Sequence, residues 1–294
     1  MTASPGRSGD NSGGWPGDVP QSGTRSRDPL AEARSWFEQG RLSKARRAAQ
    51  AQLRGAPNYA PAHVLLARIA LAQDSPARAR AAAQRALQAE PGHAGALAVL
   101  GECHLRGGRA AEAARALRAS IERAPGDPDV LGLLAIAQQT LGMLDEAVDA
   151  YRAALGVNPD SAVLNYNLAT ALKQRLQFDE AITHYRRAAE LAPEDAQLQV
   201  KLGVTLNENG RFEEAVESFE RVLAITPDDA HALGQLAHAR MKLGDGEQST
   251  EAARRLVALA PDSLGAQLVL TRGLLSAGNA EEALTVLEGA QVRA

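Results

Sequence analysis

Apolar positions recur with a helical period along this 294-residue chain. In residues 162–176, and again in residues 178–191, apolar side chains lie three, four or seven positions apart, with polar side chains between them. This spacing gathers the apolar side chains on one face of an α-helix, so each segment is predicted to be an amphipathic helix. Only one residue separates the two segments, which therefore form a helical hairpin.

The hairpin pattern repeats every 34 residues, and a proline stands near the end of each repeat without any insertion or deletion between repeats. The series is Pro57, Pro91, Pro125, Pro159, Pro193, Pro227 and Pro261. Because proline lacks an N–H and clashes with the preceding turn, each one is expected to end the second helix of its hairpin. With these prolines at position 32, repeats 1 to 8 start at residues 26, 60, 94, 128, 162, 196, 230 and 264.

Other positions of the repeat are also restricted. Position 7 is Leu in repeats 2 to 8. Position 8 holds Ala33, Ala67, Gly101, Ala135, Ala169, Gly203, Ala237 and Thr271. Position 20 holds Ala45, Ala79, Ala113, Ala147, Ala181, Ala215, Ser249 and Ala283. Residues this small let two helix backbones approach closely, so we expect the helices of each pair to cross at positions 8 and 20.

Turn and cap residues mark the ends of the predicted helices. Glycine at position 15 supplies the tight turn between the two helices of most repeats: Gly40, Gly108, Gly142, Gly210, Gly244 and Gly278. Two residues after the proline, Asp127, Ser161, Asp195, Asp229 and Ser263 are expected to cap the next first helix.

Some repeats depart from this pattern. Repeat 5 has Leu176 where the turn glycine belongs, and repeat 7 has Ser249 in place of Ala, which predicts a second helix that begins late or packs loosely. In repeat 1, Pro29 directly follows Asp28, which predicts a shortened first helix with Asp28 as its N-cap.

The pattern resembles the tetratricopeptide repeat over residues 26–294. It consists of large apolar residues, Leu followed by a small residue at positions 7 and 8, Ala at position 20 and Pro at position 32. The resemblance implies an all-α fold, a right-handed α-solenoid of about eight 34-residue helix-turn-helix units. Residues 1–25 are rich in Gly, Ser and Pro and lack this periodicity, so they are predicted to be a disordered tail. Trp15 in this tail is either a docking residue or an incidental exposed side chain.

Composition favours a cytoplasmic protein. No apolar run approaches the ~18 residues of a membrane-spanning helix, the N-terminal segment has no apolar core of a secretory signal, and Cys103 is the single cysteine. One cysteine excludes an internal disulfide and fits a reducing compartment. The abundance of Ala, Arg and Gly is typical of a bacterial sequence of high GC content.

The sequence offers no catalytic, metal or cofactor site. Phosphate-binding, HExxH, paired CxxC and GxGxxG motifs are absent, and the helical repeats occupy every residue from 26 onward. The segment Gly9–Gly14 resembles a serine-protease sequence but lies in the predicted tail. His231 and His238 share a helix face but stand roughly 10 Å apart along the axis, too far to chelate one ion alone. We therefore expect a non-enzymatic protein.

In the family that the chain resembles, first helices line a concave groove through positions 2, 5, 9, 12 and 13, often with position 6. These positions are mostly apolar in repeats 2 to 4 and polar in repeats 5 to 7, which favours a site for an extended peptide or protein segment in repeats 5 to 7. The candidate binding residues are Tyr166, Asn167, Thr170, Lys173, Lys201, Asn207, Gln235 and His238. The family's carboxylate clamp is not expected, because three of its five residues are missing.

Charge is distributed unevenly along the chain, although the formal net charge is only −3. Residues 26–127 hold 16 Lys and Arg against 9 Asp and Glu, whereas residues 128–294 hold 14 against 24. Most of the excess arginine falls on second helices of repeats 1 to 3, where a solvated face is the simplest interpretation. The asymmetry also permits head-to-tail self-association, in which a second copy or a partner covers the last repeat, since no polar capping helix follows it.

The leading hypothesis is a scaffold or adaptor that binds other proteins. One alternative is a recognition array that acts in trans with an enzyme such as a sulfotransferase, glycosyltransferase or hydroxylase. A second alternative is nucleic-acid binding through the basic face of repeats 1 to 3, which lacks interleaved aromatic residues for base stacking.

Overall fold

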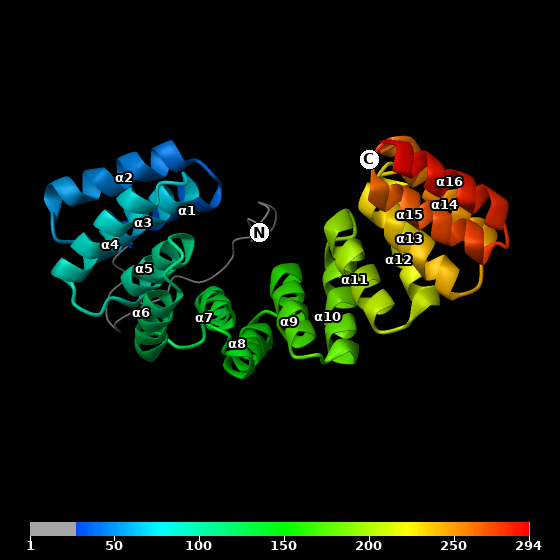
Figure 1. The fold of residues 1–294 in the computed structure, drawn as a ribbon. Helices are drawn as coiled ribbons and strands as arrows, with labels where there is room; N and C mark the ends of the chain where they lie inside the picture. Colours follow the sequence, from blue (N-terminus) through cyan, green and yellow to red (C-terminus); the bar gives the residue numbers. More distant parts are fainter. Residues whose placement is uncertain (1–27, 294) are drawn as a thin grey trace. The chain divides into compact units, whose positions relative to one another are not determined.

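The structure, a computed structural model, describes residues 28–293, and within them it contains sixteen α-helices and no strand (Figure 1). The first helices of the pairs are α1 (Ala31–Glu38), α3 (Ala60–Ala72), α5 (Ala94–Arg106), α7 (Pro128–Thr140), α9 (Ala162–Gln174), α11 (Ala196–Glu208), α13 (Ala230–Lys242) and α15 (Leu264–Ser276). The second helices are α2 (Leu42–Gly55), α4 (Pro76–Ala89), α6 (Ala110–Arg123), α8 (Leu144–Val157), α10 (Phe178–Leu191), α12 (Phe212–Ile225), α14 (Gly246–Leu259) and α16 (Ala280–Arg293). The predicted tail of residues 1–25, with Trp15, lies outside the described residues.

Helix boundaries follow the 34-residue frame closely. From α3 onward, each first helix occupies positions 1 to 13 of its repeat, and every second helix occupies positions 17 to 30. The seven prolines at position 32 come two residues after the second helices of repeats 1 to 7, as expected. The predicted all-α solenoid of helix-turn-helix repeats is confirmed.

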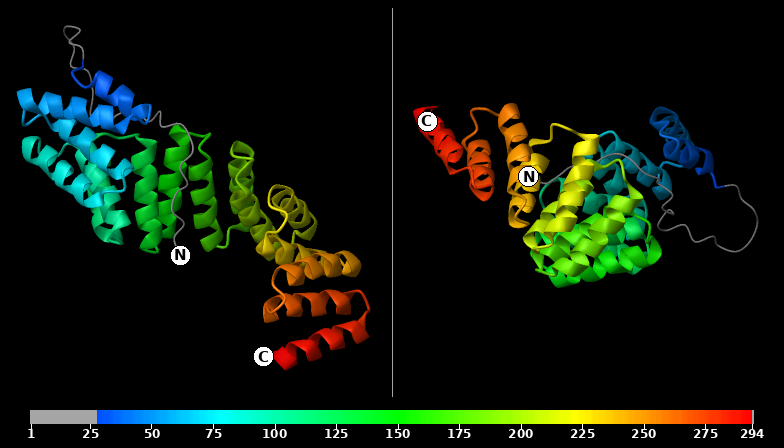
Figure 2. Two further views of the ribbon diagram at one scale, coloured as in Figure 1. Left: turned by 90° about the horizontal axis from the view of Figure 1, so that it is seen from above. Right: turned by 90° about the vertical axis from the view of Figure 1, so that its right-hand side faces the viewer.

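The helices fall into two compact units divided between Pro159 and Asp160, and each unit holds four helix pairs. Unit 1 contains α1 to α8, and unit 2 contains α9 to α16. Within each unit successive helices pack side by side, as the further views also show (Figure 2). Buried hydrophobic side chains form small clusters along each stack, among them one around Leu65 in unit 1 and one around Leu233 in unit 2.

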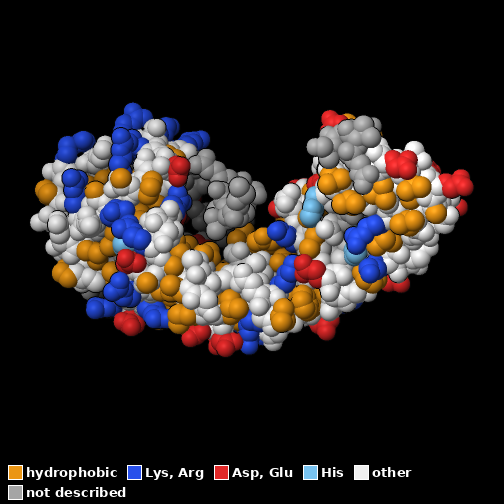
Figure 3. Space-filling model, in the orientation of Figure 1, with side chains coloured by type: hydrophobic (Ala, Val, Ile, Leu, Met, Phe, Trp, Pro, Cys, Tyr) orange, Lys and Arg blue, Asp and Glu red, His pale blue; other side chains and the backbone are white. Residues whose placement is uncertain are grey.

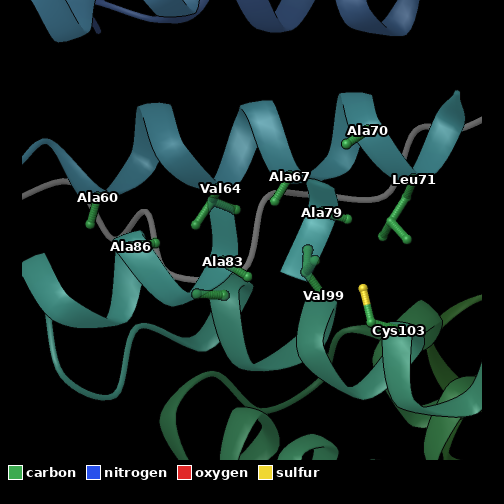
Figure 4. Close-up of a cluster of buried hydrophobic side chains, with 11 residues drawn as sticks. Ala60, Val64, Ala67, Ala70, Leu71, Ala79, Ala83, Ala86, Val99 and Cys103 are labelled. Atoms are coloured by element: carbon green, nitrogen blue, oxygen red, sulfur yellow. The ribbon is translucent and has the colours of Figure 1, made fainter. Parts of the chain in front are cut away.

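Small side chains bring the two helices of a pair together. The seven alanines and Ser249 at position 20 are all buried, at 0–1% exposure. In the α3–α4 pair, Ala67 and Ala79 lie between the helices, and Val99 and Cys103 of α5 close the same cluster from the next repeat (Figure 4). Because few aromatic residues are available, alanine and branched aliphatic side chains fill most of the core.

The predicted turns and caps are present. All six position-15 glycines have positive φ, between 69° and 85°. In repeat 5, Leu176 adopts the same left-handed conformation at φ 60° although it carries a side chain, which is 73% exposed. The side chains of Asp127, Ser161, Asp195, Asp229 and Ser263 each accept a hydrogen bond from a backbone N–H of the first helical turn.

In repeat 1, the first helix is shortened to eight residues, as predicted, but its N-cap is Leu30 and not Asp28. The Asp28 carboxylate instead accepts from the Leu30 N–H and pairs with Arg34, so it supports the chain just before the helix.

The prediction that the second helix of repeat 7 begins late or packs loosely is wrong. α14 begins at Gly246, at the same repeat position as the other second helices, and Gly246 lies against the backbone of Ser276 and Ala277. A Cβ atom on Gly246 would come within 2.5 Å of the Ala277 nitrogen, so this glycine permits a close approach between α14 and the end of α15. The buried hydroxyl of Ser249 donates a hydrogen bond to the carbonyl oxygen of Ala237, so its polar group has a partner.

Candidate functional site

Unit 2 contains a cavity of about 280 Å³ between α9, α10 and α11. It is lined by Tyr166, Thr170, Lys173, Gln174, Tyr185 and Lys201. Positions 5, 9, 12 and 13 of α9 place four of these side chains on one face of that helix, since residues three or four apart are neighbours on a helix surface. Four of the eight candidate residues from the sequence therefore line one cavity.

A pair of tyrosines forms one wall of the cavity. The rings of Tyr166 and Tyr185 lie 5.8 Å apart between centroids and are tilted by 60°. The Thr170 hydroxyl lies 2.9 Å from the Tyr166 carbonyl oxygen and 2.9 Å from the Tyr185 hydroxyl. Since Thr170 has one hydroxyl hydrogen and donates it to the carbonyl oxygen, the Tyr185 hydroxyl donates to Thr170. These contacts fix the wall from two helices, α9 and α10.

Burial governs the acidity of this wall. The pKa of Tyr185 is raised to about 12, mainly because the buried phenolate would lose its hydration, with smaller contributions from the nearby Tyr166 and Glu208. The hydrogen bond between Tyr185 and Thr170 opposes this rise and is weaker than the effect of burial. Tyr185 therefore stays protonated at neutral pH and contributes a hydroxyl group, with no charge.

Two lysines set the charge of the cavity. The Lys173 ammonium lies 2.8 Å from a carboxylate oxygen of Glu208, so most of its charge is compensated within the unit. Lys201 is exposed, and its ammonium has no ion-pair partner among the described residues. The cavity thus presents one uncompensated positive charge beside an aromatic wall, a combination that suits a ligand with a negative group and an apolar group.

The other candidate residues lie outside this cavity. The Asn207 amide donates to the backbone oxygen of Gln235 at 3.2 Å and to its side-chain oxygen at 3.1 Å, which ties α11 to α13. His238 packs edge-on against Phe212, at 6.3 Å between ring centroids. Burial lowers the pKa of His238, and the positive charges of Lys242 and Arg272 lower it further. Asn167 is half-buried on α9 and does not line the cavity.

Tyr185 is the lining residue that the sequence interpretation missed. It stands at position 24 of its repeat, on a second helix, where Tyr151 and Phe219 occupy the same position in neighbouring repeats. A large residue there is expected in the core, and Tyr185 is indeed only 2% exposed. The sequence did contain one indication of this role, the tyrosine hydroxyl at a core position. A buried hydroxyl needs a hydrogen-bond partner, and the Tyr185 hydroxyl finds one in Thr170 of the cavity wall.

The described residues contain no helix that is both long and apolar enough to cross a membrane. They also contain no group of three or more His, Cys, Asp or Glu side chains arranged to hold a metal ion.

Family sequence models described as tetratricopeptide repeat match the chain over most of its length. One matches residues 30–92 and 166–230, a second 70–137 and 206–269, a third 128–161, and a fourth 264–288. A search of curated proteins finds no significant match.

Solved structures share the fold at low sequence identity. The MamA protein is 20% identical with a TM-score of 0.54, over 57% of this chain and 92% of that one. YrrB, described as a TPR protein with an unusual peptide-binding site, is 20% identical with a TM-score of 0.55, over 63% and 96%. PilF of Pseudomonas aeruginosa is 17% identical with a TM-score of 0.59, over 71% and 95%. With its helix pairs, its repeat positions and these family models in agreement, the chain belongs to the tetratricopeptide repeat family.

Proposed function

We propose that the protein is a non-enzymatic interaction scaffold that binds an extended peptide segment of another protein along α9, α11 and α13. The observation that carries this proposal is the cavity in which an aromatic wall, Tyr166 and Tyr185, stands beside the unpaired ammonium of Lys201. We also infer a cytoplasmic location, since the single cysteine, Cys103, is a buried thiol.

The size of the cavity suits a peptide side chain. Its 280 Å³ lies at the lower limit of small-molecule sites, which occupy about 300–1,000 Å³. A side chain that enters between Tyr166 and Lys201 would leave the rest of its peptide on the neighbouring first helices. The side-chain N–H groups of Gln235 and the imidazole of His238 can make further polar contacts there.

Charge indicates which peptides would bind best. Glu208 already compensates Lys173, so a ligand carboxylate gains most at Lys201. We therefore expect a segment that carries at least one acidic side chain beside an apolar or aromatic one. The likeness to YrrB supports the mode of binding, because YrrB is a TPR protein with a peptide-binding site.

An array of immobilised peptides, with acidic, neutral and basic members that each contain an aromatic residue, tests the proposal. The full-length chain should bind a subset of the acidic members. Lys201→Ala should weaken that binding about tenfold or more, because a hydrogen bond to a charged group contributes about 1.5–3 kcal/mol. Tyr166→Ala should weaken it too, through lost apolar contact.

Lys44→Ala is the matched control, since Lys44 is exposed on α2 in unit 1 and does not line the cavity. This variant should bind the array as the wild type does, and all variants should keep the helical circular dichroism of the wild type. Equal binding by the Lys201→Ala and Lys44→Ala variants, or no binding of any peptide by the wild type, would contradict the proposed site.

A further inference from the structure

Unit 1 carries a face of unpaired positive charge on three of its second helices. We define the basic face as the eight exposed cationic side chains of α2, α4 and α6, which gather in the blue regions over these helices (Figure 3). They are Lys44, Arg47, Arg54, Arg78, Arg85, Arg115, Arg118 and Arg123. Helices α2 and α4 contain no Asp or Glu at all, so the face has little internal compensation.

The absence of ion pairs distinguishes this face from the arginines of unit 2. Among the described residues, none of the eight cations of the basic face takes part in an ion pair. In unit 2, by contrast, Arg186, Arg240 and Arg254 on or beside the second helices each pair with a carboxylate from another helix. The charges of the basic face are therefore free for a partner.

Unit 2 carries the opposite face on its own second helices. We define the acidic face as the exposed glutamates of α12, α14 and α16 that have no ion-pair partner among the described residues. They are Glu213, Glu217, Glu247, Glu251, Glu281 and Glu288. On α16, the exposed Leu284 lies among them and adds apolar surface that arginine stems can cover.

The two faces are built on second helices that occupy the same positions of the repeat. Position 22 carries a cation in repeats 1 and 3, Arg47 and Arg115, and a carboxylate in repeats 6 and 7, Glu217 and Glu251. Opposite charges thus stand at equivalent positions of helices of the same kind in the two units.

We propose that the basic face of one copy of this chain binds the acidic face of a second copy. This inference goes beyond the peptide-binding function, which concerns the first helices of unit 2. Exposed ion pairs are weak singly, so the contact depends on several pairs together and on low salt. A single-stranded nucleic acid fits the basic face less well, because α2, α4 and α6 carry no aromatic residue on which bases could stack.

Sedimentation analysis of the full chain over a range of concentrations and salt tests the proposal. The wild type should associate at low ionic strength and dissociate at high ionic strength. The variant Arg47→Glu/Arg85→Glu/Arg118→Glu should associate at least about tenfold more weakly, because each helix of the basic face then repels the acidic face. The variant Glu213→Arg/Glu217→Arg/Glu251→Arg should weaken association in the same way.

A mixture of the two reversed variants gives the decisive result. The unaltered basic face of one variant complements the unaltered acidic face of the other, and the two reversed faces also complement each other, so the mixture should form a complex that neither variant forms alone. The matched control, Arg47→Lys/Arg85→Lys/Arg118→Lys, retains the charge and should associate as the wild type does. Circular dichroism of each variant reports whether the fold is kept.

Three outcomes would overturn the proposal. One is a wild type that has the mass of a monomer at every protein concentration and every salt concentration. Another is a mixture of reversed variants that stays monomeric although both variants are folded. The third is a monomeric wild type that binds a DNA duplex probe through the basic face, which would assign that face to nucleic acid.

Discussion

At the scale of single residues, the distance between paired helices is set where position 8 meets position 24. Ala135 and Ala169 have room for their methyl groups, but Gly101 and Gly203 do not. A Cβ atom on Gly203 would lie 2.7 Å from the ring of Phe219, and one on Gly101 would lie 2.4 Å from Leu117. In these two repeats the side chain at position 24 therefore occupies the space that a methyl group at position 8 would need.

This contact predicts opposite effects for two glycine substitutions in unit 2. Gly203→Ala should lower the free energy of unfolding by about 1–3 kcal/mol, because the added methyl group overpacks against a buried aromatic ring. Gly234→Ala should raise it by about 0.5–1 kcal/mol, since its Cβ would lie 3.5 Å from Leu256, an ordinary contact, and alanine favours the helix. Urea denaturation of both variants checks the pair. Equal effects of the same sign would show that helix propensity alone governs these positions.

At the scale of the helix, the Asp127 cap of α7 makes the stability of the protein depend on pH. Asp127 accepts hydrogen bonds from the backbone N–H groups of Asp129, at 2.9 Å, and Val130, at 3.3 Å. Partial burial nevertheless raises the pKa of the Asp127 carboxyl above its ordinary value of 3.8, and the neighbouring Asp129 raises it further, against the effect of the two N–H donors. The folded state therefore holds the Asp127 proton more tightly than the unfolded state does.

The sign of the resulting pH dependence follows from linkage. A raised carboxyl pKa means that stability is lost as pH rises from 3.8 through the folded-state pKa. Asp127→Asn keeps an oxygen that can cap α7 and removes the charge, so it should be more stable than the wild type at neutral pH. The difference should vanish below pH 3.8, where both side chains are neutral. Urea denaturation at neutral and acidic pH measures it.

Asp127→Ala provides the control for capping. This variant loses the acceptor and should be less stable by about 1 kcal/mol at neutral pH, because one or two N–H groups of α7 lose their partner. If Asp127→Asn were as unstable as Asp127→Ala, the cap would depend on the carboxylate charge, and the raised pKa would not govern the stability of this helix end.

The helices and their caps could be predicted from the sequence because each depends on local chemistry. Proline at position 32, glycine at position 15 and the Asp or Ser caps act within one turn of the chain. The cavity wall depended on a contact between helices, and Tyr185 at position 24 therefore read as a core residue. The packing of α14 was predicted wrongly for the same reason, since the backbone that Gly246 approaches belongs to the end of α15, in the next repeat.

At the scale of the whole molecule, stability is expected to follow the two units. In a repeat protein, each repeat contacts only its neighbours, so stability is approximately a sum of repeat and interface contributions. Two buried clusters of unit 2 lie around Leu198, between α10 and α11, and around Leu233, between α13 and α15. Both consist of unit 2 residues.

A fragment of residues 160–294 should therefore fold without the rest of the chain. We expect helical circular dichroism and a cooperative thermal transition, because its four helix pairs retain their clusters and the Asp195, Asp229 and Ser263 caps. Gly203→Ala should destabilise the fragment by the same amount as it destabilises unit 2 in the full chain, since Phe219 lies within the fragment. An unfolded fragment, or one that folds only when residues 1–159 are added, would show that stability passes across the boundary at Pro159 and that the two units fold as one.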